Sequence, residues 1–141
     1  MAEHVSISAS AFTGHSQSTG HTRDSPGSYK KKTINSGFLH APVSLPDGCK
    51  IKKIMVHFVD NSDTGCLAVN LYRTNHFSGS YSILFSVDSS GATTSTDMRW
   101  LTDSTFSPAS SRQVLNGPLT WNLSMNFTEA DTDLRVYSVQ I

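Results

Sequence analysis

The sequence has no excess of charge of either sign and few charged residues of any kind. Lysine plus arginine and aspartate plus glutamate both number 11 among 141 residues, so the formal net charge is zero. Such a chain sets up no long-range field that would attract nucleic acid or an acidic lipid surface. We therefore expect no nucleic-acid partner and no membrane partner.

Long apolar runs are missing as well. No stretch approaches the roughly 20 residues that a membrane-spanning helix needs. Residues 1–12 lack the basic start and the apolar centre of a secretory signal. We expect a soluble protein that is cytoplasmic as the sequence stands, while a secreted or cell-surface origin as a trimmed mature domain stays open.

Cysteine is scarce, with only Cys49 and Cys66 in the chain. If the two lie on facing strands of a hairpin that turns at residues 62–63, they stand about ten residues apart along the ladder, roughly 33 Å. A disulfide cannot span such a distance, so we predict two thiols, as in a reducing compartment. Paired cysteines or histidines at metal-ligand spacing are also absent, and we predict no metal site and no cofactor.

Alternation of apolar and polar residues dominates the chain, and helical periodicity is absent. The clearest case is residues 119–128, where one face carries Leu119, Trp121, Leu123, Met125 and Phe127 and the other only Asn, Ser and Thr. Similar but shorter patterns predict strands near residues 5–8, 33–45, 54–59, 67–73, 81–87, 98–101 and 134–141. With turn signals every ten or so residues, they predict one all-β domain over residues 1–141, an antiparallel β-sandwich of jelly-roll type.

The polar segment 13–32 has almost no apolar residue and many turn formers. Because such a segment cannot bury enough surface to order itself, we predict a long mobile loop near the N-terminus.

Residues 45–73 form the centre of the predicted fold. Pro46, Asp47 and Gly48 predict a turn, and two apolar runs joined by the polar residues 60–65 predict strand, turn and strand, which we interpret as a hairpin. A calcium loop of the EF-hand type starting at Asp60 would need an acidic residue where Leu71 stands. We therefore favour a turn in which Asp and Asn side chains accept hydrogen bonds from nearby amides.

No catalytic residue is evident. A nucleophile elbow of the G-x-S-x-G type is absent. His57 stands between Val56 and Phe58, and we interpret it as a core histidine bonded to a neighbouring carbonyl rather than as a general base. A non-enzymatic role is favoured, and a hydrolase with its site at the strand ends is the alternative.

Aromatic residues outside the clearest core pattern are the candidates for ligand contact. We assign Trp100, Tyr72 and Tyr81 to a candidate binding site, together with Asp60 and Asn61 in the loop that follows the central strand. Loops at the ends of a rigid sandwich commonly carry function, and aromatic rings can stack on a sugar or insert into a protein partner. The predicted function is a binding or interaction domain with a carbohydrate or protein ligand.

Self-association is the third expectation. Zero net charge, apolar strands and short edge strands favour pairing into a symmetric oligomer, a dimer or a trimer. A purely structural oligomerising subunit is therefore a further alternative to a ligand-binding domain.

Three motifs, SASAF at residues 8–12, LPDG…DN…LYR across residues 45–73 and LRVYSVQI at 134–141, carry a resemblance. Together they resemble a group of uncharacterised small bacterial β-sandwich domains, including proteins of the mobile gene-cassette type. The group has no settled activity, so the resemblance implies a fold and no catalytic residue. The chain departs from the pattern in the lysine-rich residues 50–53 and in the long segment 13–32.

Overall fold

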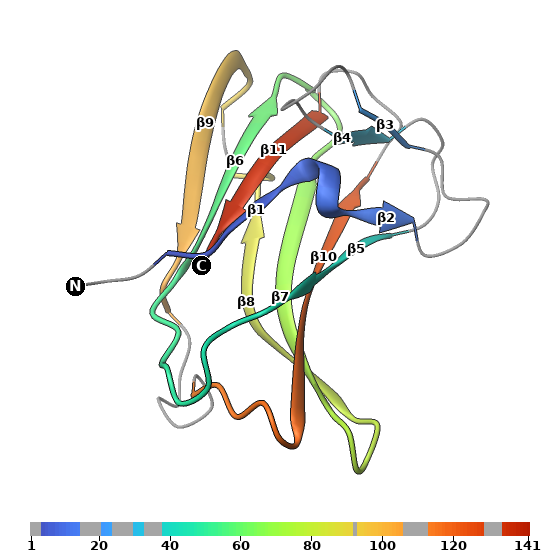
Figure 1. The fold of residues 1–141 in the computed structure, drawn as a ribbon. Coiled ribbons are helices and arrows are strands. Elements are labelled where there is room, and N and C mark those ends of the chain that lie inside the picture. Colours follow the sequence, from blue (N-terminus) through green and yellow to red (C-terminus); the bar gives the residue numbers. More distant parts are fainter. Residues whose placement is uncertain are drawn as a thin grey trace.

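The computed structural model describes residues 4–14, 21–23, 30–32, 38–91, 93–105, 113–128 and 134–141. These residues form two antiparallel sheets that face each other, so the predicted β-sandwich is confirmed (Figure 1). Within this described part, the single helix is the three-residue 3-10 turn η1 (Ala9–Ala11), and no helix is long and apolar enough to cross a membrane.

One sheet has six strands and the other has five. The six-stranded sheet runs in the order β3 (His21–Arg23), β4 (Lys30–Lys32), β11 (Leu134–Gln140), β6 (Ile54–Asp60) and β9 (Ser95–Asp103), and β1 (Ser6–Ser8) also pairs with β11. The five-stranded sheet runs in the order β2 (Thr13–Gly14), β5 (Leu39–Val43), β10 (Leu119–Phe127), β7 (Leu67–Asn75) and β8 (Tyr81–Asp88).

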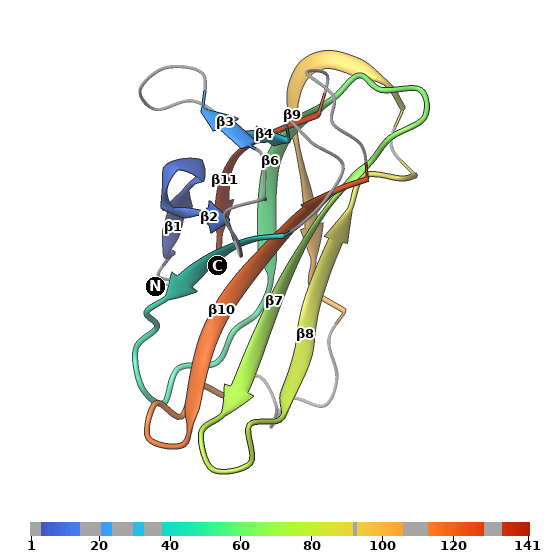
Figure 2. The ribbon, with the colours of Figure 1, turned by 90° about the vertical axis from the view of Figure 1, so that its right-hand side faces the viewer.

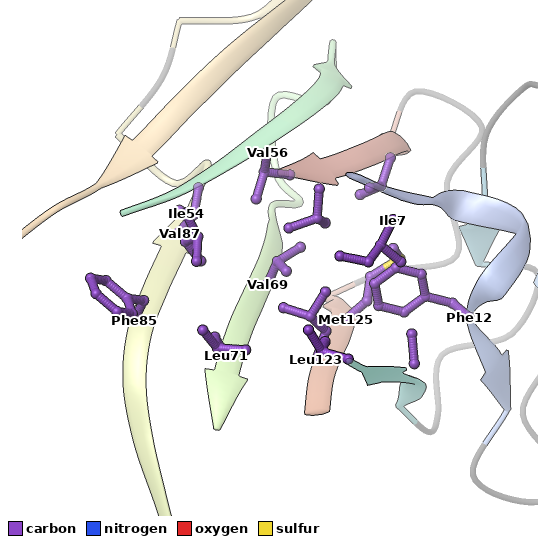
Figure 3. Close-up of a cluster of buried hydrophobic side chains, with 14 of the residues drawn as sticks. Ile7, Phe12, Ile54, Val56, Val69, Leu71, Phe85, Val87, Leu123 and Met125 are labelled. Atoms are coloured by element: carbon purple, nitrogen blue, oxygen red, sulfur yellow. The ribbon is translucent and has the colours of Figure 1, made fainter. Parts of the chain in front are cut away.

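The core lies between the two sheets, where the apolar faces of their strands meet (Figure 3). From β10 it takes Trp121, Leu123, Met125 and Phe127, all buried, as the strict alternation of this strand predicts. The polar residues of β10 consequently face outward. The chain passes from β1 in one sheet through η1 to β2 in the other. Phe12, between η1 and β2, is fully buried in the core on that side of the sandwich.

Short strands occupy part of the segment for which we predicted a loop. β2, β3 and β4 all lie within residues 13–32, and β3 pairs with β4, which in turn pairs with β11. The prediction missed them because two or three residues are too few to show a period. The other residues of that segment lie outside the described part.

The predicted hairpin of residues 45–73 is wrong. β6 pairs with β11 and β9, whereas β7 pairs with β10 and β8, so the two strands belong to different sheets. The true hairpin at this point of the chain is β7–β8, closed by the 75–80 turn with Gly79 at a positive φ of 69°. Cys49 and Cys66 are not joined by a disulfide, as predicted. The prediction rested on a wrong reason, however, because it placed the two cysteines on a hairpin that the structure does not contain.

Asp60 turns the chain out of β6. Its Oδ1 accepts the Ser62 amide at 3.1 Å, so the predicted Asx-type turn is present. Its Oδ2 accepts the Ser89 hydroxyl at 2.5 Å, and the same hydroxyl oxygen accepts the Leu67 amide at 2.9 Å. Leu67 begins β7 and Ser89 follows β8, and both strands belong to the five-stranded sheet. This buried network therefore joins the two sheets where the chain crosses between them.

Candidate functional site

The outward face of the five-stranded sheet is polar along its centre. Figure 2 turns this sheet toward the viewer, with β10 between β5 and β7. On β10, Asn122 and Ser124 point outward, and the register places Asn70 and Tyr72 of β7 directly beside them. The side-chain amides of Asn122 and Asn70 each offer two donors and an acceptor, and the hydroxyls of Ser124 and Tyr72 can donate or accept. This part of the face is therefore a hydrogen-bonding surface.

Four rings form a row across this polar face. Phe38 is the residue before β5, and His40 lies in β5. Tyr72 belongs to β7 and Tyr81 to β8. The ring centroids of Phe38 and His40 are 6.4 Å apart, those of His40 and Tyr72 6.3 Å, and those of Tyr72 and Tyr81 6.3 Å. These distances lie within the range of favourable aromatic contacts. The row therefore extends over β10 from β5 to the edge strand β8.

A hydrogen bond fixes the middle of the row. The Tyr72 hydroxyl lies 3.1 Å from His40 Nδ1 although β10 runs between their strands. Ser124, the β10 residue that pairs with His40, is only 9% exposed although it points outward. Burial raises the pKa of the Tyr72 phenol above its ordinary value, so its hydroxyl keeps its proton across the biological pH range. The row thus includes a neutral phenol that donates or accepts hydrogen bonds.

A β-bulge places Tyr81 in the row. Leu71 pairs with Phe85 but the next residue, Tyr72, pairs with Ile83, so Leu84 is an extra residue in β8. Leu84 and Phe85 are both buried, while Tyr81 and Ile83 are 71% and 52% exposed. The alternation of Tyr81, Ile83, Phe85 and Val87 suggests one common face, but the bulge divides them between two. Bulges commonly re-aim side chains in this manner.

The predicted site residues do not form one group. Tyr72 and Tyr81 come together on the five-stranded sheet, whereas Trp100 lies on the outward face of β9 in the other sheet, paired with His57. Asp60 is buried at the sheet crossing, and both of its carboxylate oxygens are occupied. Asn61 follows it at that end of the sandwich. The ring row therefore includes two of the five predicted residues.

Phe38 and His40 were missed by sequence reasoning. Neither belongs to a long alternating run. The usable signal was parity, because His40 and Pro42 alternate with the core residues Leu39, Ala41 and Val43. Pro42 pairs with Asn122 on one side, and β2 reaches only Leu39 and His40 on the other. β5 is thus an edge at Pro42, where the missing amide of a proline is tolerated.

His57 is not the core histidine that we predicted. It is half-buried on the outward face of the six-stranded sheet, and its Nδ1 lies 3.2 Å from the Ser138 hydroxyl rather than beside a carbonyl. Phe58 and Val56 face inward, so period two alone puts His57 outside. A serine beside a histidine has the composition of an activated nucleophile. Neither residue, however, lines the two cavities of about 530 and 100 Å³ that lie elsewhere in the described part of the chain.

The larger of these cavities has a volume of about 530 Å³ and lies at the end of the six-stranded sheet where β6 begins and β11 ends. The other measures about 100 Å³ and is lined by Arg73, Asn75, Ser80, Ser82 and Leu119 near the β7–β8 turn. Within the described residues, no group of three or more His, Cys, Asp or Glu side chains is placed to hold a metal ion.

Known protein-family models and curated protein sequences contain no match to this chain. Solved structures do share its fold. The xylan-binding module CBM15 matches with a TM-score of 0.59 at 11% identity, over 98% of this chain and 94% of that one. The C-terminal CBM6 of LamC, a marine laminarinase from Zobellia galactanivorans, matches with a TM-score of 0.56 at 10% identity, over 98% of both chains.

An exo-β-1,3-galactanase from Phanerochaete chrysosporium, solved with galactose, gives a TM-score of 0.57 at 11% identity. The match covers 99% of this chain but only 29% of the galactanase, so the chain corresponds to one part of that enzyme. At these identities the likeness concerns the fold, a jelly-roll β-sandwich of the kind found in carbohydrate-binding modules.

Proposed function

We propose that this protein is a non-catalytic carbohydrate-binding domain whose site is the outward face of the five-stranded sheet. The observation that carries the proposal is the row formed by Phe38, His40, Tyr72 and Tyr81 across a face whose central strand presents asparagine, serine and threonine. Sugar rings have apolar faces of C–H groups and a rim of hydroxyls. Aromatic rings pack against the former and side-chain amides bind the latter.

The shape of the face favours a polymer rather than a small sugar. No residue of the row lines either of these two cavities, and Phe38 and Tyr81 are 48% and 71% exposed, so the row is accessible to a chain that lies across it. The row reaches from β5 to β8, which gives several successive sugar units a contact. An open face of this kind also favours binding over hydrolysis, since hydrolysis needs catalytic groups placed around one bond.

The likeness to carbohydrate-binding modules supports the proposal at the level of fold. A role on polysaccharides would place the protein outside the cell, which is the secreted or surface origin that the sequence leaves open. The resemblance to small bacterial β-sandwich domains remains part of this proposal.

Titration calorimetry with soluble xylan, laminarin and β-1,3-galactan tests the proposal directly. We expect at least one of them to bind, and Tyr81→Ala to weaken that binding at least about fivefold, because a stacked aromatic contact is worth roughly 1 kcal/mol beyond its area. Tyr72→Ala should weaken it at least as much, since it also removes the hydrogen bond to His40.

Phe77→Ala is the matched control. Phe77 is 88% exposed at the tip of the β7–β8 turn and lies outside the row, so its loss should leave affinity unchanged. Trp100→Ala reports on the opposite sheet. If no polysaccharide binds, or if Trp100→Ala abolishes binding while both tyrosine variants keep it, this assignment of function and face is wrong.

A further inference from the structure

The cavity of about 530 Å³ lies away from the ring row and has a different chemistry. Lys50, Lys52 and Lys53 line it, together with the side chains of His4 and Gln140. These lysines belong to the segment in which the sequence departs from the pattern that it otherwise resembles. Three of the 11 basic residues of an electrically neutral chain thus gather around one hollow.

No carboxylate side chain is present among the described residues that line this cavity. Lys50, Lys52 and Lys53 are exposed, so their ammonium groups are accessible to a ligand. A cleft lined by charges of one sign on low-dielectric walls concentrates counter-ions of the opposite sign. The cavity therefore selects for a negatively charged group.

Apolar side chains form much of the remaining lining, among them Val5, Leu45, Ile51 and Met55. Leu45 and Ile51 are buried members of the core, so the floor of the cavity is continuous with it. Tyrosine, tryptophan and phenylalanine are absent from the described lining, which distinguishes this cavity from the ring row and argues against a stacked sugar. An apolar floor below a cationic rim fits a ligand with an apolar body and an anionic head.

Hydrogen bonds hold one wall of the cavity in place. The Gly48 amide donates to the Val114 carbonyl at 2.8 Å, and the Val114 amide donates to the Cys49 carbonyl at 2.9 Å. The side-chain amide of Asn116 donates to the Leu45 carbonyl at 2.9 Å. On the other side, Val5 and Ile141 exchange a pair of backbone hydrogen bonds. A site that is already formed costs a ligand less ordering on binding.

We propose that this cavity binds a small amphiphilic carboxylate, with the carboxylate among Lys50, Lys52 and Lys53 and the apolar body on the floor made by Leu45, Ile51 and Met55. A volume of about 530 Å³ is that of an ordinary small-molecule site. The inference does not depend on carbohydrate binding, because the two sites lie on different sheets and share no residue.

Amide NMR titration of the whole chain with octanoate tests this proposal. We expect saturable shifts at residues 45–55 and at the neighbouring ends of β1 and β11. Acetate, which has the charge without the apolar body, and octanol, which has the body without the charge, should each bind at least tenfold more weakly. Octyl sulfate distinguishes a requirement for carboxylate from a requirement for any anionic head.

The triple substitution K50Q/K52Q/K53Q should weaken octanoate binding about tenfold, since three exposed ion pairs each contribute a fraction of a kcal/mol. The matched control is K30Q/K31Q/K32Q in β4, a strand that pairs with β11 at Val136; it removes the same number of charges and should bind octanoate as the native chain does. Dispersed amide spectra establish that both variants are folded.

Three results would overturn the proposal: equal binding of octanol and octanoate, equal losses in the two triple variants, or shifts that lie outside the cavity. Binding of octyl sulfate in place of octanoate would also contradict the assignment to carboxylates. Tyr81→Ala should bind octanoate normally, so failure here is distinguishable from failure of the carbohydrate proposal.

Discussion

Asp60 ends β6 with both carboxylate oxygens already engaged by Ser62 and Ser89. It is 4% exposed, which leaves it no surface to offer to a sugar or a metal ion. A buried polar group without its partner costs roughly 1–3 kcal/mol. Asp60 is therefore a structural residue that holds the crossing between the sheets.

We predict that Asp60→Ala lowers the free energy of unfolding by about 2–3 kcal/mol, because it leaves the Ser62 amide and Ser89 hydroxyl without this acceptor. Asp63→Ala, three residues further along the same loop, serves as the control. Asp63 is exposed and should change stability by less than about 0.5 kcal/mol. Urea unfolding measures both, and equal effects would show that the network contributes nothing.

Asp103 carries a pH-dependent part of the stability. Burial alone would raise the pKa of its carboxyl, but hydrogen bonds from the Ser86 amide and from the amide and hydroxyl of Thr105 together lower it below its ordinary value. A carboxyl with a lowered folded-state pKa stabilises the fold above its ordinary pKa of about 4. That contribution is lost as the pH falls through the folded-state pKa.

We predict that Asp103→Asn costs about 1 kcal/mol of stability at pH 7, and that the difference from the native protein shrinks as the pH is lowered below about 4. Urea unfolding at several pH values gives the comparison. Asp97→Asn, an exposed residue of the same strand, should show no such convergence. A difference that stays constant with pH would mean that the Asp103 charge is not involved.

At the scale of elements, the bulge in β8 decides what the five-stranded sheet presents. Leu71 pairs with Phe85 and the next residue, Tyr72, pairs with Ile83, so the register shifts by one residue at Leu84. Leu84 itself is only 3% exposed, so the extra residue adds a core side chain while leaving Tyr81 outside. Because of this bulge, residues 81, 83, 85 and 87 do not share one face: the first two point outward and the last two lie in the core.

We predict that deleting Leu84 leaves Tyr81 outward, because the flanking pairs need not move. It should cost about 1.5–3 kcal/mol for the lost leucine burial. Deleting Ser82 instead should turn Tyr81 toward the interior, since one residue fewer between Tyr81 and Ile83 reverses its face. Broadening of the Tyr81 ring signals by a soluble paramagnetic agent distinguishes the two variants. Equal broadening in both would contradict the assigned register.

On the scale of the whole molecule, exposed apolar residues lie on both sheets. Ile83 joins the ring row on one side, and Met98 and Trp100 are 56% and 62% exposed on the other. β9, which carries the latter two, is an edge strand. Surfaces of this kind can bind a ligand or a second copy of the chain.

Self-association remains a prediction. We expect sedimentation velocity to show a dimer or trimer at high micromolar concentration, in keeping with the zero net charge. If the contact uses β9, then Trp100→Ser should shift the distribution toward monomer while Tyr81→Ala does not. A sharp monomer boundary at the highest concentration would exclude the oligomer.

The sequence by itself determined the fold class, the number of domains that we expect and most of the strands. Alternation with a period of two is a local property, and it is unambiguous where it is long, as in β10. It also determined that Trp121 belongs to the core and that residues 60–65 form an Asx-type turn. Local spacing is sufficient for each of these conclusions.

Only the tertiary structure decided which strands are neighbours. The same apolar runs at β6 and β7 are compatible with a hairpin or with a crossing between sheets. The choice depends on β10 and β11, whose residues pair with partners 44 or more positions earlier in the chain. The ring row needed this information too, because its members come from β5, β7 and β8. Side chains that meet across a third strand leave no local pattern, and an extra residue such as Leu84 reverses parity without changing the composition.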